Sequence, residues 1–236
     1  MARTKSLRKL GDSYIATLDN AEATWAEVKR TERRKAAAED IFLRMVVGWE
    51  EFVSDWFIGA LNHDATRYKA NQEQKLAEWL RNAIDQSEYA RFADCFRPPK
   101  LTAIDRYPPV ATVRRLLDPD EKNIEFRTFQ HLLKRSTDCH ASKFISRIAG
   151  LKAFGGDEII DAALAIRNVL AHRSTKALRT MNERVAAFSH YPALQKKIMS
   201  KDGIGTYLAA RTPAGMTRRF VLAASSLLAA SCARRR

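Results

Sequence analysis

Three side chains of the stretch "IRNVLAHRST", residues 166 to 175, could do chemistry together: Arg167, Asn168 and His172. Histidine exchanges protons near neutral pH, and arginine presents a fixed fork of donors to oxyanions without deprotonating. Asparagine prefers caps and turns to helix interiors, so its position beside Arg167 needs an explanation. The stretch indicates either an ordinary polar helix surface or a site for acid–base chemistry.

The residues before this stretch predict the helix that carries it, from Glu158 to about Arg173. The segment "FGGDEIIDAAL" opens with a Gly-Gly turn, and Asp157 is of a type that caps helix N-termini. Glu158 then stands in the first turn, where the helix dipole favours negative charge. We therefore expect Asp157 to be the N-cap of this helix.

Successive residues of this helix turn by about 100°, which places each side chain on a face. Four apolar residues mark the core side: Ile159, Ala163, Ile166 and Leu170. Asn168 and His172 are four residues apart and share the face away from that core. Ile160 and Leu164 also lie off the core direction, which predicts a second apolar contact surface.

Two interpretations of this helix remain open. In the first, His172 complements the dipole at the helix C-terminus and Arg167 forms a surface ion pair. In the second, the face with Asn168 and His172 meets a second copy of the chain, so that two arginines and two histidines converge in one cleft. Ile160 and Leu164 would then be interface residues.

The first part of the chain reads as helices with apolar residues at steps of three or four. One is expected over 14–28, and the basic run at 29–35 that follows it is typical of a solvated helix face. The wide apolar stripe over 41–61 predicts the principal core helix. A third helix is expected over 72–84. The side of that third helix predicted to face inward comprises Leu76, Trp79, Leu80 and Ala83.

Prolines interrupt the helical pattern and predict a long loop near residues 97 to 120. Helix is expected to resume over 123–135 and again over 142–154. Two more amphipathic helices are predicted, between Lys176 and Met199 and between Gly215 and Ala233. The sequence thus predicts an all-α chain.

Length and charge constrain the class of partner. A chain of 236 residues can bury roughly 70% of its unfolded surface without a disulfide or metal. Lys+Arg 41 against Asp+Glu 27 gives a formal net charge of +14. This balance favours an anionic partner, either nucleic acid or a lipid surface.

The cysteines do not form a disulfide or zinc pattern. Cys95, Cys139 and Cys232 include no CxxC pair and no histidine at zinc-finger spacing. We therefore expect a reducing, cytoplasmic compartment, no metal and no cofactor. Cys139 is interpreted as a small buried hydrophobe beside a surface histidine, His140.

The C-terminal "MTRRFVLAASSLLAASCARRR" looks like a twin-arginine signal with a lipoprotein-type cysteine, but at the wrong end of the chain. Its apolar run over 220–230 is shorter than the ~20 residues that span a bilayer. A packed final helix is expected there and no membrane partner, with membrane association through this helix as the weaker alternative.

The motif helix resembles a known superfamily. "RNVLAH" resembles the HEPN signature, in which arginine is followed after four to six residues by histidine, with a polar residue directly after the arginine. "RRKAAAEDIFLRMVVGWEEFVSDWF" and "IRNVLAHRS" are similar to the HEPN branch named for association with ribosomal L-PSP endonucleases. The resemblance covers roughly residues 33 to 180. Ser174 stands where a toxin branch paired with nucleotidyltransferase antitoxins has tyrosine, which argues against that antitoxin as a partner.

The resemblance implies a HEPN-like helical bundle with additional N- and C-terminal helices. The bundle would span about 33–180, with the proline-rich loop near 97–120 as an insertion. Residues 181–236 would form a C-terminal helical extension, and 1–236 a single helical domain.

The resemblance also implies a metal-independent endoribonuclease, of the toxin or anti-phage effector type, that cleaves RNA by 2′-OH attack at a composite site in a homodimer. His172 would transfer protons, Arg167 would bind and stabilise the transition state, and Asn168 would orient the histidine or the phosphate. Two histidines, one from each protomer, would supply the acid and the base. Three cations beyond the motif could hold flanking phosphates or face solvent: Arg173, Lys176 and Arg179.

A second function stays open, namely a non-catalytic HEPN-like RNA-binding or scaffold protein whose basic surface holds RNA without cutting it. The partners expected are RNA, a second copy of the chain, and an antitoxin or another defence-system protein.

Overall fold

The computed structural model describes residues 6–28, 31–87, 100–102, 104–119, 124–190, 195, 198 and 200–210. Within these ranges the chain is helical and has no strand, so the predicted all-α class is confirmed. The helices are α1 (Leu7–Glu27), α2 (Thr31–His63), α3 (Thr66–Asp85), α4 (Val110–Leu117), α5 (Phe129–Cys139), α6 (Ser142–Ala149), α7 (Gly156–His172), α8 (Thr175–Ala186) and α9 (Ile204–Ala209), with short 3₁₀ helices η2 (Gly150–Phe154) and η4 (Lys201–Gly203).

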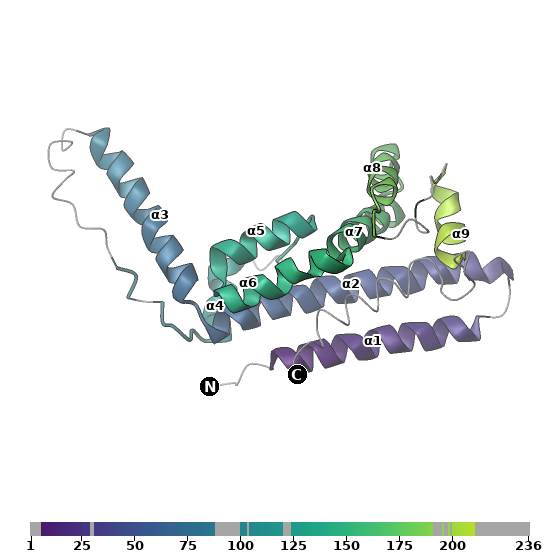
Figure 1. Cartoon of the computed structure of the whole chain (residues 1–236), viewed down its shortest axis with the longest axis horizontal. Helices are drawn as coiled ribbons and strands as arrows, with labels where there is room; N and C mark the ends of the chain where they lie inside the picture. The colour runs from purple at the N-terminus through teal and green to yellow at the C-terminus, as the bar shows by residue number, and fades with distance from the viewer. Residues whose placement is uncertain are drawn as a thin grey trace.

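The 33-residue helix α2 is the central element, as its apolar stripe predicts. It lies between α1 on one side and α7 and α9 on the other (Figure 1). The hydroxyl of Tyr14 in α1 donates to the carbonyl of Met45 at 3.1 Å, and the Tyr14 ring stacks on Phe52 with centroids 5.3 Å apart. The core therefore forms along the length of α2.

The helix predicted over 14–28 begins earlier, at Leu7. The hydroxyl of Ser6 accepts a hydrogen bond from the amide of Lys9 at 3.2 Å and caps this helix. Lys29 and Arg30 of the basic run lie outside the described residues.

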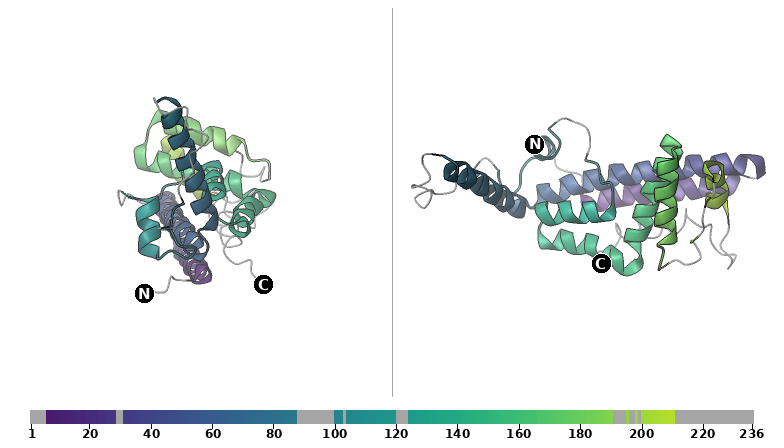
Figure 2. Two further views of the ribbon diagram at one scale, coloured as in Figure 1. Left: turned by 90° about the vertical axis from the view of Figure 1, so that its left-hand side faces the viewer. Right: turned by 90° about the horizontal axis from the view of Figure 1, so that it is seen from above.

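Helix α3 projects away from the rest of the molecule, and both Figure 1 and Figure 2 show it extending beyond the other helices. Its first turns contact α5: Tyr68 is buried, and the side-chain amide of Asn71 donates to the carbonyl of Asp138 at 3.0 Å. The inward face predicted for this helix is wrong for Trp79, which is 64% exposed, and for Ala83, which is exposed, whereas Leu76 and Leu80 are half-buried. Among the helices that the structure describes, only the start of α3 has a neighbour, so none of them covers Trp79 as the prediction assumed.

The segment predicted as a loop near 97 to 120 contains a helix, α4, which begins directly after Pro109. Proline is tolerated at a helix start, where its missing N–H costs no hydrogen bond, so the prolines there initiate α4. The helix predicted over 123–135 instead starts at Phe129, because the hydroxyl of Thr128 accepts from the amide of His131 at 3.0 Å and caps α5. Residues 97–99, 103 and 120–123 lie outside the described residues.

The C-terminal part is only partly described. The helix predicted between Lys176 and Met199 ends at Ala186, and the next described α-helix is α9. The helix predicted between Gly215 and Ala233 lies outside the described residues, as do Cys95 and Cys232. Among the helices that the structure describes, none is both long and apolar enough to cross a bilayer.

His140 is fully buried, so its predicted surface position is wrong, whereas its neighbour Cys139 is buried as predicted. The His140 imidazole lies 4.1 Å from the Phe57 ring centroid, with Nε2 3.0 Å from the Phe57 carbonyl oxygen. Burial lowers the pKa of His140 to about 4, although the bond to Phe57 opposes this, and burial raises the pKa of the Cys139 thiol to about 11. Both groups are neutral packing residues.

Candidate functional site

The motif helix α7 extends from Gly156 to His172, close to the predicted boundaries. Its N-cap is Gly155 with φ 65°, so the prediction that Asp157 is the N-cap is wrong by two residues. A left-handed cap suits glycine, and the Gly-Gly pair therefore ends the preceding turn and starts the helix. Asp157 and Glu158 both lie in the first turn.

The predicted faces of α7 are partly confirmed. Asn168 and His172 are exposed on the side away from the core, as expected. Ile160 and Leu164, predicted as interface residues, are instead 3% and 5% exposed within the single chain. Helices α2, α5 and α8 all pack on α7 and enclose it on several sides, so the second apolar surface is already covered. That surface gives no reason for a second copy.

Arg167 forms an ion pair, as the first interpretation of the helix predicts, within a small network whose other members the sequence did not identify. Its Nη1 donates to Oδ1 of Asn168 at 2.9 Å, and its Nη2 donates to Oε1 of Glu50 in α2. The side chains of Arg167 and Glu50 are each 29% exposed, and Nε of Arg167 is buried without a hydrogen-bond partner among the described residues. Asn168 thus orients the guanidinium that Glu50 pairs.

Glu50 is the functional candidate that sequence reasoning missed. It stands within "GWEEFV" of the apolar stripe, where a glutamate at the edge of a core helix carries no motif. Its proximity to Arg167 depends on how α2 and α7 pack, which the local pattern does not encode.

An open groove of about 400 Å³ lies beside Arg167. The carboxylates of Glu50, Glu51, Asp55 and Glu125 line this groove, against the two cations Arg114 and Arg167. Arg114 pairs with Asp55 at 2.8 Å, as Arg167 pairs with Glu50. The groove is therefore acidic overall, which disfavours an anionic ligand along most of its length.

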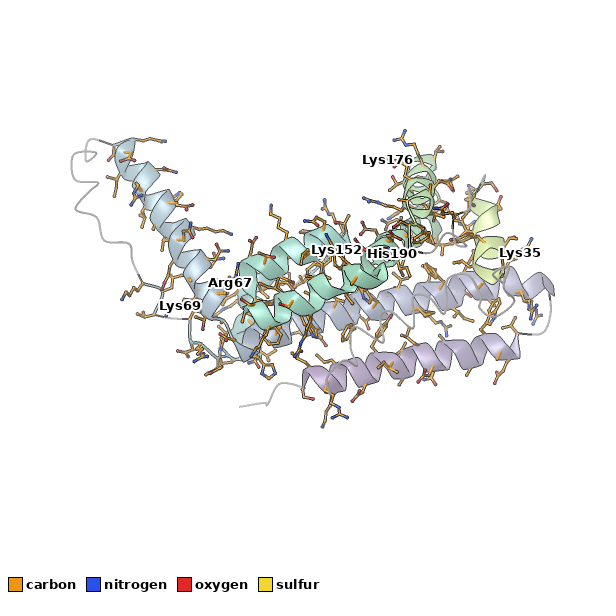
Figure 3. All side chains as sticks on the ribbon, viewed as in Figure 1. Lys35, Arg67, Lys69, Lys152, Lys176 and His190 are labelled. Carbon is orange, nitrogen blue, oxygen red and sulfur yellow. The ribbon has the colours of Figure 1, made fainter. Side chains whose placement is uncertain are left out.

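The three cations predicted to hold flanking phosphates do not gather in one place. Arg173, the C-cap of α7, lines a second groove of about 250 Å³ together with Lys35 and Lys201. Lys176 is exposed on α8, and Figure 3 shows it well away from Lys35. Arg179 is exposed and forms an i,i+4 ion pair with Glu183 at 3.8 Å. Only Arg173 belongs to a concave, cationic site.

A Ser–His–Glu cluster joins the start of α7 to the segment after α8. The Glu158 carboxylate accepts from the amides of Ser189 and His190 at 3.0 and 3.2 Å, and from the Ser189 hydroxyl. Nδ1 of His190 lies 3.1 Å from the same carboxylate, so the imidazole does not stand between serine and glutamate as a nucleophile triad requires. This cluster ties two segments together.

No group of three or more histidine, cysteine, aspartate or glutamate side chains in the described part of the chain could hold a metal ion. His172 has no hydrogen bond or ion pair with another described residue, and its imidazole is open to a ligand.

Neither a protein-family model, nor a curated protein, nor a solved structure matches the chain. The resemblance of "RNVLAH" to the HEPN signature therefore rests on the residues quoted for it. The function is inferred from the geometry of α2 and α7.

Proposed function

We propose that the chain is a metal-independent endoribonuclease of the HEPN type, acting on RNA as a toxin or anti-phage effector. The observation that carries the proposal is the fixed guanidinium of Arg167, held by Asn168 and Glu50, on the same helix as the exposed His172. These are the residue types that bind a phosphodiester and move protons around it.

Cleavage by the 2′-OH needs a base for that hydroxyl, an acid for the leaving 5′-oxygen and positive charge on the phosphate. His172 serves in proton transfer because imidazole titrates near neutrality. Arg167 stabilises the charge that develops on the phosphate oxygens, and Asn168 holds the guanidinium in place. Glu50 acts through Arg167 as a positioning residue.

The proposed architecture is a HEPN-like bundle of α2 to α7 over about 33–180. Helix α1 and the C-terminal extension 181–236 are additions to this bundle, and all form one helical domain. Within it, α2 supplies Glu50 and α7 supplies the motif.

The site is proposed to be completed by a second copy, because one chain offers a single motif histidine for two proton transfers. Since Ile160 and Leu164 are buried in the single chain, the contact must use the exposed residues Asn168, Ala171 and His172. A cytoplasmic location and an antitoxin or defence-system partner stay predictions.

A specific observation favours a second candidate, the non-catalytic RNA-binding or scaffold protein. Glu50 neutralises the guanidinium that would bind phosphate, and the groove around it is acidic. In that case Arg167 locks α7 onto α2, and RNA contacts other basic surfaces.

One assay separates the two candidates. Labelled RNA is incubated with the purified protein in EDTA, and the ends of any products are analysed. The nuclease leaves 2′,3′-cyclic phosphates, and His172→Ala lowers the rate by ~10²- to 10⁴-fold while the melting temperature stays close to the wild type. Retention of intact RNA by both proteins supports the binder, and equal cleavage by both removes His172 from the mechanism.

A further inference from the structure

Arg167 and Arg173 lie along one seam between α2 and α7. Arg167 and Leu170, at a step of three, face α2, and Arg173 follows Leu170 by another three residues. Arg167 stands in the last two turns of α7 and Arg173 directly after its end, so the two arginines follow one another along this seam. On α2 the facing carboxylates are Glu50 and Glu39. They are eleven residues apart, about three helical turns, so they lie on almost the same face of α2.

The end of this seam at Arg173 is a groove with three cations from three separate elements. Lys35 comes from the start of α2, Arg173 from the end of α7 and Lys201 from η4. Figure 3 shows Lys35 beside α9. Helix α9 packs tightly on α2, since a Cβ at Gly205 would lie only 2.7 Å from the Lys35 carbonyl oxygen. The groove is therefore part of the packed fold.

Two carboxylates, Glu39 and Asp202, also line the groove, so its formal charge is positive by one. Burial raises the pKa of Glu39 and outweighs both its bond from the Gly205 amide and the charge of Arg173. The acidic groove beside Arg167 has the opposite balance, with four carboxylates against two arginines. Charge along the seam thus directs an anionic chain from Arg167 toward Arg173.

The backbone of Arg173 has the left-handed conformation. Its φ of 47° makes it the one non-glycine residue with positive φ among the described residues. Helices commonly end on a left-handed glycine, whereas a side chain there costs roughly 1 kcal/mol or more. The arginine at this position brings its charge to Glu39 and the groove, where glycine would bring none.

We infer that the groove formed by Lys35, Arg173 and Lys201 binds a backbone phosphate of the RNA strand, further along that strand than the phosphate held at Arg167. The inference rests on the proposed function and names the path of its substrate. The strand runs along the α2–α7 seam toward α9, and Lys176 and Arg179 on α8 are not part of that path.

The test uses the full chain and a fluorescent, 2′-O-methylated single-stranded RNA, which lacks the attacking hydroxyl and cannot be cleaved. Fluorescence anisotropy measures its affinity for the wild type and for Lys35→Ala, Lys201→Ala and Arg173→Asn. Asparagine accepts the left-handed conformation, so Arg173→Asn removes the charge and keeps the fold. Arg44→Ala, which removes an exposed charge elsewhere on α2, is the matched control.

Each groove variant is expected to bind the RNA about tenfold more weakly, because it loses one charge-assisted hydrogen bond. Arg44→Ala should bind nearly as tightly as the wild type. The salt dependence of the affinity should also fall by about 0.7 in log–log slope for a lost phosphate contact. Unchanged affinity in all three groove variants would overturn the inference. So would a free 5′-mononucleotide that binds as tightly as the oligonucleotide, because it would assign the groove to a small anion.

The outcome is distinguishable from failure of the proposed function. If the groove variants lose binding but the wild type cuts no RNA, the phosphate-binding groove is supported and the proposed nuclease activity is contradicted. If the groove variants bind RNA normally while His172→Ala abolishes cleavage, the nuclease activity is supported and the phosphate-binding groove is contradicted.

Discussion

Glu50 in α2 accepts a hydrogen bond from Arg167 in α7, 117 positions further along the chain. This pair joins the longest helix to the motif helix, and each side chain is 29% exposed. The same contact either positions the guanidinium for chemistry or only fastens the two helices.

A double-mutant cycle measures how much the Glu50–Arg167 pair contributes to the stability of the fold. Urea unfolding of the wild type, Glu50→Ala, Arg167→Ala and the double variant should give a coupling of about 1 kcal/mol, the upper end of the range for exposed pairs, because this one is half-buried. Zero coupling would mean that the pair contributes nothing to folding.

RNA cleavage by two Glu50 variants tests whether Glu50 positions the Arg167 guanidinium for the reaction. Glu50→Gln keeps an acceptor oxygen for Arg167, whereas Glu50→Ala removes it. If Glu50 positions the guanidinium, Glu50→Gln should retain most of the activity and Glu50→Ala should lose it, at equal soluble levels. Equal rates for both variants would assign no positioning role to Glu50.

Leu164→Arg should strongly destabilise the fold and lower its melting temperature. Leu164 is 5% exposed, and an unpaired charge at such a site costs about 3–5 kcal/mol. Circular dichroism melting is the measurement. A native-like melting curve for Leu164→Arg would show that the site is exposed in solution.

Ala171→Arg tests the proposed second copy at an exposed position of the same helix. This variant should fold, and if Asn168, Ala171 and His172 meet a partner it should be monomeric. Light scattering at micromolar concentration compares it with the wild type. A wild type that is already monomeric contradicts the composite site.

Stability should fall as the pH falls from about 6.5 to about 4, owing to His140. Its pKa drops from 6.5 in the unfolded chain to about 4 in the fold, so between these values the unfolded state binds more protons and acid favours unfolding. The full effect is about 3 kcal/mol. Urea midpoints measured across this range should slope upward with pH, and less steeply in His140→Asn. Equal slopes would mean that other groups carry the dependence.

Trp79→Ser should change the free energy of unfolding by at most about 0.5 kcal/mol, since the side chain is 64% exposed. Tyr68→Ala, at the buried start of the same helix, should cost about 3 kcal/mol. Acrylamide quenching of tryptophan fluorescence gives an independent check, because removal of Trp79 should reduce the readily quenched fraction. A large loss of stability in Trp79→Ser would mean that this face of α3 is covered.

Much of the secondary structure follows from local pattern. The 3.6-residue period places the apolar residues of 41–61 on one side of a long helix, and the same geometry puts Asn168 and His172 on the outer side of α7. Helix ends are harder to predict from sequence, since each depends on a single local feature, such as the capping hydroxyl of Thr128 or the left-handed backbone of Gly155.

The helical class and the outward direction of Asn168 and His172 were readable from residue order, because they depend on neighbours within a few turns. Packing among distant segments settled the rest. Glu50 meets Arg167, and Arg173 meets Lys35 and Lys201, only because α2, α7 and η4 come together. Burial also depends on the packing of distant segments. Three helices cover α7 and remove Ile160 and Leu164 from the surface, and aromatic rings enclose His140. Trp79 extends past every helix that could cover it among the described residues. A periodicity shows that a face is apolar, but the free energy of burying it depends on which partner the whole fold brings to it.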